Sequence, residues 1–384
     1  MKCSLLLFLF GLLNSSPILL KAQNDLPSDL LATPATINLY RNLKKNLGKS
    51  ILFGHQDDLA YGVGWFGDHN RSNLKDLMGD YPAVYGWELG GIELDATYNL
   101  DSVSFCAMRE YIQSGYQQGS VITISWHLLN PVNLSSAWDT SKGVVKEILP
   151  GGKRHDLYLL WLDKVAFFLN SLHAKDGSMI PILFRPFHEL NGNWFWWGQN
   201  RCTAEEYKAL MRMTIGYLRD TKHIHHLLYA YNTDFFKSKE NYLERYPGDD
   251  LIDILSFDYY QQGETKPDPF FVQNLDHQLG LLEQLATDHN KIPALSETGY
   301  KNLPEATWFT EYLLKGIGNH KLSYLLLWRD GGMVTGIAPK LFEPSTIHFL
   351  PIKYHPSVPD FIKMCTSGKF IFQREVANLH LYRK

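Results

Sequence analysis

Short apolar runs separated by amphipathic stretches recur along the chain after residue 50. The runs are rich in β-branched and aromatic residues, and each ends in polar or aromatic side chains. They cover residues 50–55, 83–88, 121–127, 182–189, 227–232, 254–260, 292–297 and 324–329. Because the runs are apolar on both faces, they predict parallel strands buried within a larger fold.

Helical periodicity fills most of the intervals between these strands. It predicts helices at residues 33–47, 101–118, 155–173, 204–220, 274–289 and 304–318. The repeated alternation of strand and helix indicates an α/β protein with a (β/α)8 barrel, and an open doubly wound sheet is the alternative. No internal repeat or linker marks a second domain, so we expect one catalytic barrel domain over residues 23–384.

Residues 1–22 have the pattern of a secretory signal peptide. Lys2 supplies the positive start, residues 5–13 are apolar, and cleavage after Ala22 is expected. The alternative is a membrane anchor, but the apolar run is interrupted and short for a bilayer. We therefore predict export to the periplasm or out of the cell, with no membrane attachment after the signal is removed.

Composition adds a few constraints. The chain has 384 residues, a net charge of −3 and 45% hydrophobic residues, which is typical of a soluble globular protein and gives no argument for nucleic-acid binding. After loss of the signal, Cys106, Cys202 and Cys365 remain, so at most one disulfide can form. Sparse cysteine together with export fits a bacterial exported enzyme.

The stretch 181–198, PILFRPFHELNGNWFWWG, is the most informative part of the chain. It places Glu189 at the end of a predicted strand, directly before four aromatic residues at 194–197. Aromatic rings stack on sugar faces and exclude water, and desolvation raises the pKa of a carboxyl toward that of a general acid. We therefore interpret the four rings as the wall of a sugar site. The alternative is a strand followed by a hydrophobic loop.

Glu297 is the candidate partner of Glu189, because the two residues end the fourth and seventh predicted strands. Glycoside hydrolysis needs two carboxyl groups at the anomeric centre, one protonated and one ionised. An ionised nucleophile needs donors close by, and Arg185 and Tyr260 are the obvious ones. The alternative for Glu297 is a salt-bridged loop residue.

In a (β/α)8 barrel, catalytic groups lie at the carboxyl ends of the strands. All eight runs end in side chains that suit a site, and we expect them to converge at one rim: His55, Glu88, His127, His188 with Glu189, Asn232, Asp258 with Tyr260, Glu297, and Trp328 with Arg329. We expect the histidines to bind sugar hydroxyls or a carboxylate, Trp328 to form the floor of the sugar pocket, and Arg329 to reach the next sugar. The alternatives are that the histidines are buried core residues, that Trp328 packs in the core and that Arg329 forms an ion pair.

At these residues the chain resembles glycoside hydrolase family 26, and specifically its β-mannanases. The similarity runs from the FGHQDD segment (53–58) to the HPSVPDF segment (355–361). Its most specific element is R-P-x-H-E followed by N-G-x-W-F-W-W-G. Most barrel glycosidases of the same clan have asparagine before the acid/base glutamate, whereas this family has histidine, as His188 is here.

The resemblance implies a retaining endo-1,4-β-mannosidase acting on β-mannan or manno-oligosaccharides, with Glu189 as acid/base and Glu297 as nucleophile. It also implies a monomer without metal or cofactor, and carboxyl groups about 5–5.5 Å apart. His188 and Tyr260 match residues that position the carboxylates. Further matches are sugar contacts: His127, Trp194, Asp258 and Trp328 around the cleavage point, and Arg329 one sugar further away.

Several alternatives stay open. A related β-glucanase or xylanase would use the same machinery, and an exo-acting enzyme that releases mannobiose would differ in the rim loops at 59–71, 90–99 and 130–151. A non-catalytic carbohydrate-binding protein is disfavoured because both glutamates are present. A metal-dependent hydrolase or deacetylase is disfavoured because the H-E-L-N-G motif lacks the second histidine of a helical zinc site.

Overall fold

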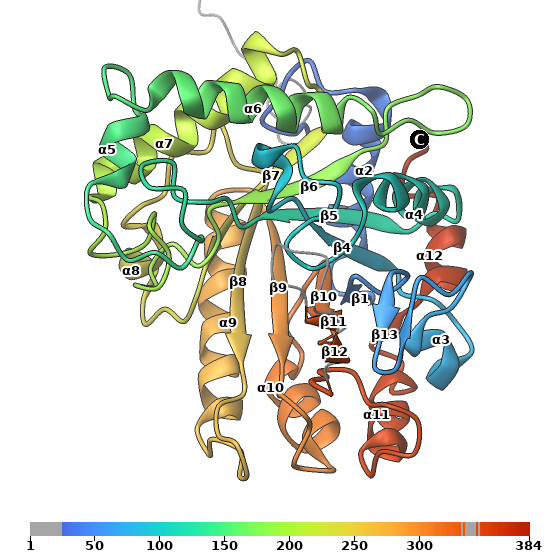
Figure 1. Ribbon diagram of the computed structural model, residues 1–384. Coiled ribbons are helices and arrows are strands. Elements are labelled where there is room, and N and C mark those ends of the chain that lie inside the picture. The colour runs from blue at the N-terminus through green and yellow to red at the C-terminus, as the bar shows by residue number, and fades with distance from the viewer. Residues whose placement is uncertain (1–24, 332, 335–342, 345) are drawn as a thin grey trace, which may run out of the picture.

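Eight parallel strands form a closed barrel in which the last strand pairs with the first (Figure 1). The computed structural model describes residues 25–331, 333–334, 343–344 and 346–384, so the predicted signal at 1–22 lies outside the described residues. The barrel strands are β1 (Ile51–Gln56), β4 (Val84–Glu88), β5 (Val121–Trp126), β6 (Ile182–Pro186), β7 (Leu227–Thr233), β8 (Ile254–Tyr260), β9 (Ile292–Gly299) and β10 (Tyr324–Leu327). The predicted (β/α)8 barrel is confirmed, and the open-sheet alternative is wrong.

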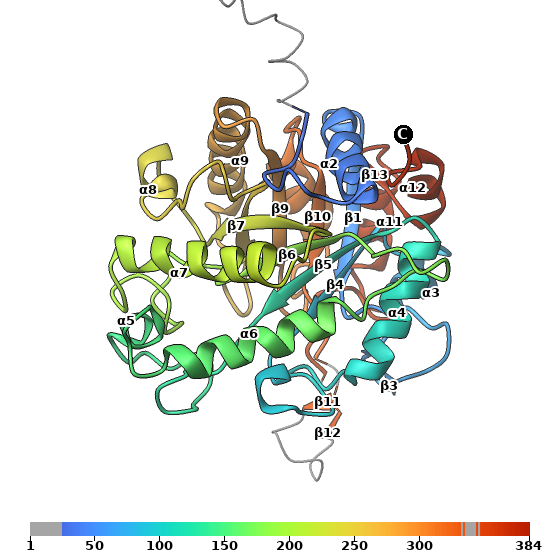
Figure 2. The same cartoon turned by 90° about the horizontal axis from the view of Figure 1, so that it is seen from above.

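Helices surround this barrel, as the view from above shows (Figure 2). They are α2 (Pro34–Asn46), α3 (Asn73–Met78), α4 (Phe105–Gln117), α5 (Val144–Ile148), α6 (His155–Leu169), α7 (Ala204–Gly216), α8 (Lys239–Leu243), α9 (Phe271–Asp288), α10 (Lys315–Ile317), α11 (Val358–Cys365) and α12 (Gln373–Leu379). A 3-10 turn, η1 (Ile92–Leu94), and two π-helical segments, η2 (Tyr217–Thr221) and η3 (Phe309–Leu314), complete the helical elements of the described residues.

Short strands lie outside the barrel wall. β2 (Tyr61–Gly62) pairs with β3 (Trp65–Phe66), and β11 (Met333–Val334) pairs with β12 (Glu343–Pro344), both antiparallel. β13 (Phe370–Ile371) extends the sheet beside β1.

The barrel interior is apolar toward the amino ends of its strands. One buried cluster joins interior side chains of the strands to α2, and includes Leu39, Tyr40, Leu43, Leu52, Val84, Val121, Leu183, Leu228, Ile254, Ala294 and Leu326. Thr33 caps the amino end of α2, because its hydroxyl accepts the N–H of Thr36 at 3.3 Å, and Pro34 then begins the helix, a favourable start. Because α2 closes this end, the opposite end is left for polar groups.

The predicted boundaries hold within a few residues, with three informative differences. The strand expected at 182–189 ends at Pro186. The helix expected at 204–220 is α7 followed by the π-helical η2, and the helix expected at 304–318 is the π-helical η3 followed by the short α10. Cys106 is exposed, Cys202 and Cys365 are buried, and all three are free thiols, so no disulfide links the described cysteines. Among the described residues, no helix combines the length and apolar character that crossing a bilayer requires.

Candidate active site

The turn that follows β6 presents Glu189 through an unusual backbone. Phe187 and Glu189 have φ values of 53° and 51°, in the left-handed region that non-glycine residues rarely adopt. Buried hydrogen bonds hold this turn: the Tyr207 hydroxyl donates to the Phe187 carbonyl at 3.1 Å, and the Trp197 indole N–H donates to the His188 carbonyl at 2.9 Å. These contacts explain why the strand stops at Pro186.

The aromatic run at 194–197 is mostly core, which corrects the interpretation of four rings as a sugar wall. Phe195, Trp196 and Trp197 are buried, and only Trp194 is partly exposed. The indole N–H of Trp196 donates to the carbonyl of Leu128 at 3.2 Å, so its polar atom is satisfied inside the protein. One indole of the run therefore remains for a ligand.

Glu189 lies in surroundings that suit a general acid. Its Oε2 accepts a hydrogen bond from the Trp194 indole at 2.6 Å. Burial, reinforced by the negative charges of Glu297 and Asp234, raises the pKa of Glu189 to about 8, although Trp194 and His127 act in the opposite direction. At neutral pH the carboxyl group therefore carries a proton that it can give to a leaving group.

Glu297 has the opposite surroundings, because donors converge on its oxygens. The Tyr260 hydroxyl donates to Oε2 at 2.7 Å, and the Arg185 guanidinium forms an ion pair with Oε1. Arg185 also bonds Asp258 at 2.8 Å, and the amide of Asn232 donates to the same Asp258 oxygen at 2.8 Å. The two donors that the sequence suggested for Glu297 are thus in contact with it.

Three carboxylates meet at this point. One oxygen from each of Glu189, Asp258 and Glu297 lies within 4.8 Å of the others, a spacing that could also hold a metal ion. Burial raises the pKa of Asp258 well above its usual range, an effect that the charge of Arg185 opposes and the two glutamates reinforce. Because Arg185 bonds two of the three groups, the chain itself supplies positive charge here.

The predicted histidines lie side by side at the same rim. His188 and His127 are buried, and their Nε2 atoms are 3.0 Å apart. Nδ1 of His127 lies 2.8 Å from a carboxylate oxygen of Glu88, which ends β4. Both ring nitrogens of His127 are therefore in contact with protein groups.

Trp328 and Arg329 follow β10 at this rim. Trp328 is partly exposed, and its ring centroid lies 6.4 Å from that of His127. Arg329 forms an ion pair with Asp101, with 2.8 Å between Nε and Oδ1, and its Nη1 lies 3.4 Å from the Tyr61 hydroxyl. The alternative of ion pairing is thus realised for Arg329, while 28% of its side chain stays accessible to a ligand.

One predicted rim residue belongs elsewhere. His55 is buried and bonds Asp58 at 2.7 Å, with the charge of Asp330 nearby, so it joins a separate polar cluster. Conversely, sequence reasoning missed Trp138 and Asp234. Trp138 is 47% exposed and stacks on His127 at 5.0 Å between ring centroids. The only signal for it was its place in a variable rim loop.

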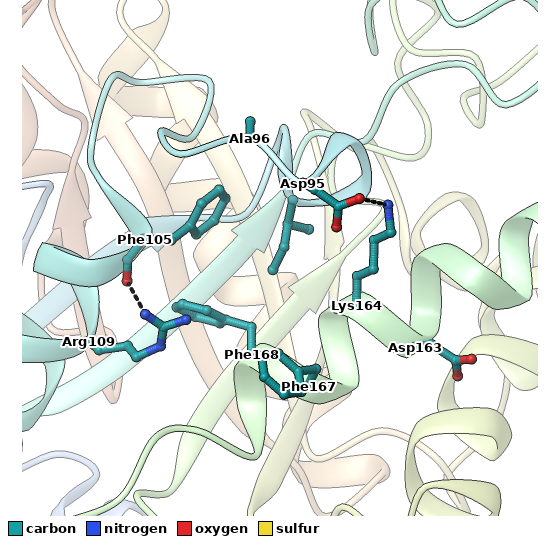
Figure 3. A pocket seen from close by; sticks show the side chains of 9 residues that line it. Asp95, Ala96, Phe105, Arg109, Asp163, Lys164, Phe167 and Phe168 are labelled. Atoms are coloured by element: carbon teal, nitrogen blue, oxygen red, sulfur yellow. Dashed lines mark hydrogen bonds and ion pairs between the residues drawn. The ribbon is translucent and has the colours of Figure 1, made fainter.

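Hollows also occur away from the rim. One of them has a volume of about 440 Å³ and lies beside η1, α4 and α6, where Phe167 is exposed. Figure 3 shows the side chains that line it. Lys164 there bonds Asp95 at 2.7 Å, and Arg109 donates to the Phe105 carbonyl at 3.3 Å. No carboxylate pair with opposed surroundings lines this hollow, so the chemistry points to the barrel mouth.

Comparison with known proteins identifies a family and several similar proteins. The sequence profile of glycosyl hydrolase family 26 matches residues 29–311. A mannan endo-1,4-β-mannosidase of Bifidobacterium adolescentis is 34% identical over 279 residues, covering 71% of this chain and 28% of that protein. A Bacillus subtilis mannan endo-1,4-β-mannosidase is 28% identical over 257 residues, covering 64% of this chain and 66% of that protein. The chain thus spans less than two thirds of the length of either relative. Among solved structures, a GH26 β-mannanase from Bacteroides ovatus, BoMan26A, matches with a TM-score of 0.84 and 42% identity, covering 92% of this chain and 98% of that one.

Proposed function

Because the chain belongs to glycosyl hydrolase family 26, we propose that it is a retaining β-mannanase that cleaves β-1,4-mannosidic linkages in mannan, galactomannan or glucomannan. The observation that carries the proposal is the pair Glu189 and Glu297, adjacent carboxyl groups with opposite surroundings. Glu189 has a pKa raised to about 8 by loss of solvation and by neighbouring negative charge, whereas Glu297 accepts hydrogen bonds from Tyr260 and Arg185. Such a pair supplies both an acid and a nucleophile.

The proposed reaction has two displacements. Glu189 gives its proton to the glycosidic oxygen while Glu297 attacks the anomeric carbon, so that the leaving sugar departs and a glycosyl ester forms. Glu189 then takes a proton from water, which attacks the ester and releases Glu297. Oxygens within 4.8 Å support this route, since an inverting enzyme holds its carboxyls about 6.5–9.5 Å apart to admit water between them.

Other side chains at the rim are proposed to bind sugar. Trp194 and Trp328 offer partly exposed indoles on which a pyranose can stack. The remaining proposed contacts are His127, His188, Asp258 and Tyr260 at the cleavage point, and Arg329 one sugar further away. A monomer exported to the periplasm or beyond the cell suits a polymeric substrate, and it is part of the same proposal.

Digestion of linear mannohexaose tests substrate and mode of action in one assay. We expect hydrolysis in which the β-anomer of the product forms first, as proton NMR can detect. An α-anomer formed first would overturn retention. Early products limited to mannobiose and the mannotetraose that it leaves would indicate exo action, whereas early mannotriose as well would indicate endo action. Parallel digests of xylan and β-glucan test the alternative specificities. The Glu297→Ala variant should lose nearly all turnover, and wild-type turnover in that variant would overturn the assignment.

A further inference from the structure

The carboxylate of Glu88, at the carboxyl end of β4, is fully buried and surrounded by donors. Oε1 accepts the backbone N–H groups of Gly90 and His127, both at 2.6 Å. Oε2 accepts the Ser125 hydroxyl at 2.6 Å and faces Nδ1 of His127 at 2.8 Å. Burial would raise the pKa of Glu88, but the charge and hydrogen bonds of His127 outweigh it and lower the pKa below its usual value. Glu88 is therefore ionised and can only accept hydrogen bonds.

An ionised acceptor at 2.8 Å determines the proton position on His127. Nδ1 of His127 must carry hydrogen, because a bare nitrogen lone pair would face the carboxylate. Nε2 of His127 then lies 3.0 Å from Nε2 of His188, so one of these nitrogens donates and the other accepts. The result is a continuous chain from Glu88 through His127 to His188, the residue that precedes Glu189.

The surroundings assign the positive charge within this chain. Burial lowers the pKa of His127, but Glu88 outweighs it and, with Glu297 and Asp101, raises the pKa above its usual value. Burial and the charges of His127 and Arg185 hold the pKa of His188 well below its usual value. The other contacts of the His127 ring are neutral aromatic side chains: Trp138, Phe195 and Trp328.

We infer that Glu88 is a positioning residue of the hydrolase: it fixes the ring plane and the Nδ1–H form of His127 and, through His127, the neutral His188 beside Glu189. This inference rests on the proposed function for its effect on rate. The part of the inference that concerns the proton on His127 Nδ1 does not depend on any substrate. At metal sites, a carboxylate that orients a ligand histidine changes affinity or activity about 10- to 100-fold when it is removed, and we expect an effect of the same order here.

Glu88→Gln removes the charge and keeps the shape. The Gln carbonyl can still accept the two backbone N–H groups, but its amide then turns a donor toward His127 Nδ1, so that nitrogen must lose its proton. We expect the 15N spectrum of histidine-labelled protein to move the His127 Nδ1 signal from the protonated to the unprotonated range. On mannohexaose, kcat/KM should fall about 10- to 100-fold.

Glu93→Gln is the matched control. Glu93 is also a buried carboxylate beside this loop, and it accepts the Trp126 indole at 3.2 Å and the backbone N–H of Leu129 at 2.8 Å. None of its recorded hydrogen bonds involves either histidine ring. Its amide variant should leave the His127 signal in place and kcat/KM within about threefold. Equal losses in both variants would reduce Glu88 to a purely structural role.

The wild-type spectrum tests the inference even if Glu88→Gln fails to fold. An unprotonated His127 Nδ1 in the folded wild-type protein at pH 7 would overturn it, as would a protonated Nδ1 in Glu88→Gln. Assignment of the signal comes from its absence in His127→Asn. A wild-type protein that shows the protonated Nδ1 but cleaves no mannohexaose would instead refute the proposed function and leave the hydrogen-bond chain intact.

Discussion

Replacing Trp194 with phenylalanine should move the basic limb of the pH–activity profile to higher pH. The Trp194 indole donates to Glu189 at 2.6 Å and so stabilises the carboxylate form of the acid. Burial nevertheless keeps the pKa of Glu189 at about 8. Phenylalanine retains an aromatic ring but has no donor, so the carboxylate becomes less stable and the pKa rises further.

The size of the shift follows from the lost hydrogen bond. A hydrogen bond to a charged group contributes about 1.5–3 kcal/mol, and about 1.4 kcal/mol corresponds to one pKa unit. Both Trp194 and Glu189 are partly accessible to water, which replaces some of the lost interaction. We therefore expect the lower end of this range, a shift of about one pH unit.

The assay is kcat/KM on mannohexaose from about pH 5 to about pH 10, which extends roughly two units above the raised pKa of the acid, about 8. The wild-type rate should fall as pH rises through about 8, because Glu189 then loses its proton. Trp328→Phe is the control, since Trp328 is another partly exposed rim indole, whereas the indole that donates to Glu189 belongs to Trp194. It should lower the rate without moving the limb. If the basic limb of the Trp194→Phe profile stays at the wild-type pH, or moves to lower pH, the reasoning is refuted.

The other predictions concern the same carboxylates. Asp234→Asn should shift the basic limb to lower pH, because the Asp234 charge raises the pKa of Glu189; an unchanged limb would count against it. Tyr260→Phe removes the 2.7 Å donor to Glu297, and kcat should fall about 10- to 100-fold, with unfolding temperature as the stability control. Dialysis against a chelator should leave kcat unchanged, because Arg185 supplies positive charge among the carboxylates; loss restored by a divalent cation would contradict this.

The apolar pattern predicted the strands well because parallel barrel strands are buried on both faces, and few other structures require such runs. It failed at the end of β6, where apolar Phe187 continues the run but adopts a left-handed φ. Hydrophobicity carries no information about that dihedral. Buried contacts with Tyr207 of α7 and with Trp197, further along the same loop, hold the turn, and the apolar pattern does not reveal either contact.

The aromatic run at 194–197 shows that composition alone does not reveal which rings face a ligand. The sequence suggested that Phe195, Trp196 and Trp197 line a sugar site, because exposing large apolar rings to water is unfavourable unless the rings bind a ligand. In the fold they are buried, with Phe195 stacked on Trp197 at 4.4 Å between ring centroids. Composition cannot separate a ring that faces a ligand from one that faces the core, because successive loop residues point in unrelated directions. Position beside Glu189 was informative for Trp194 alone.

Alternation along the strands explains which rim residues converge. Residues two apart share a face, so the inward Val84 and Leu183 place Glu88 and Arg185 inward as well. The same rule turns His55 away from the inward Leu52, which accounts for its separate contact with Asp58. The period of two therefore carried more information about the site than the polar character of each strand end.

Glu297 breaks this alternation, and a register shift explains why it still faces the site. Strand β9 points Ala294 into the barrel, so strict alternation would turn Glu297 outward. Phe257 pairs with Leu295, but the next residue, Asp258, pairs with Glu297, which leaves one extra residue on β9. Such a bulge re-aims the side chain that follows it, a device common beside active sites. The irregularity brings Glu297 beside Asp258, and a pattern-based prediction that keeps a strict period of two has no means of finding it.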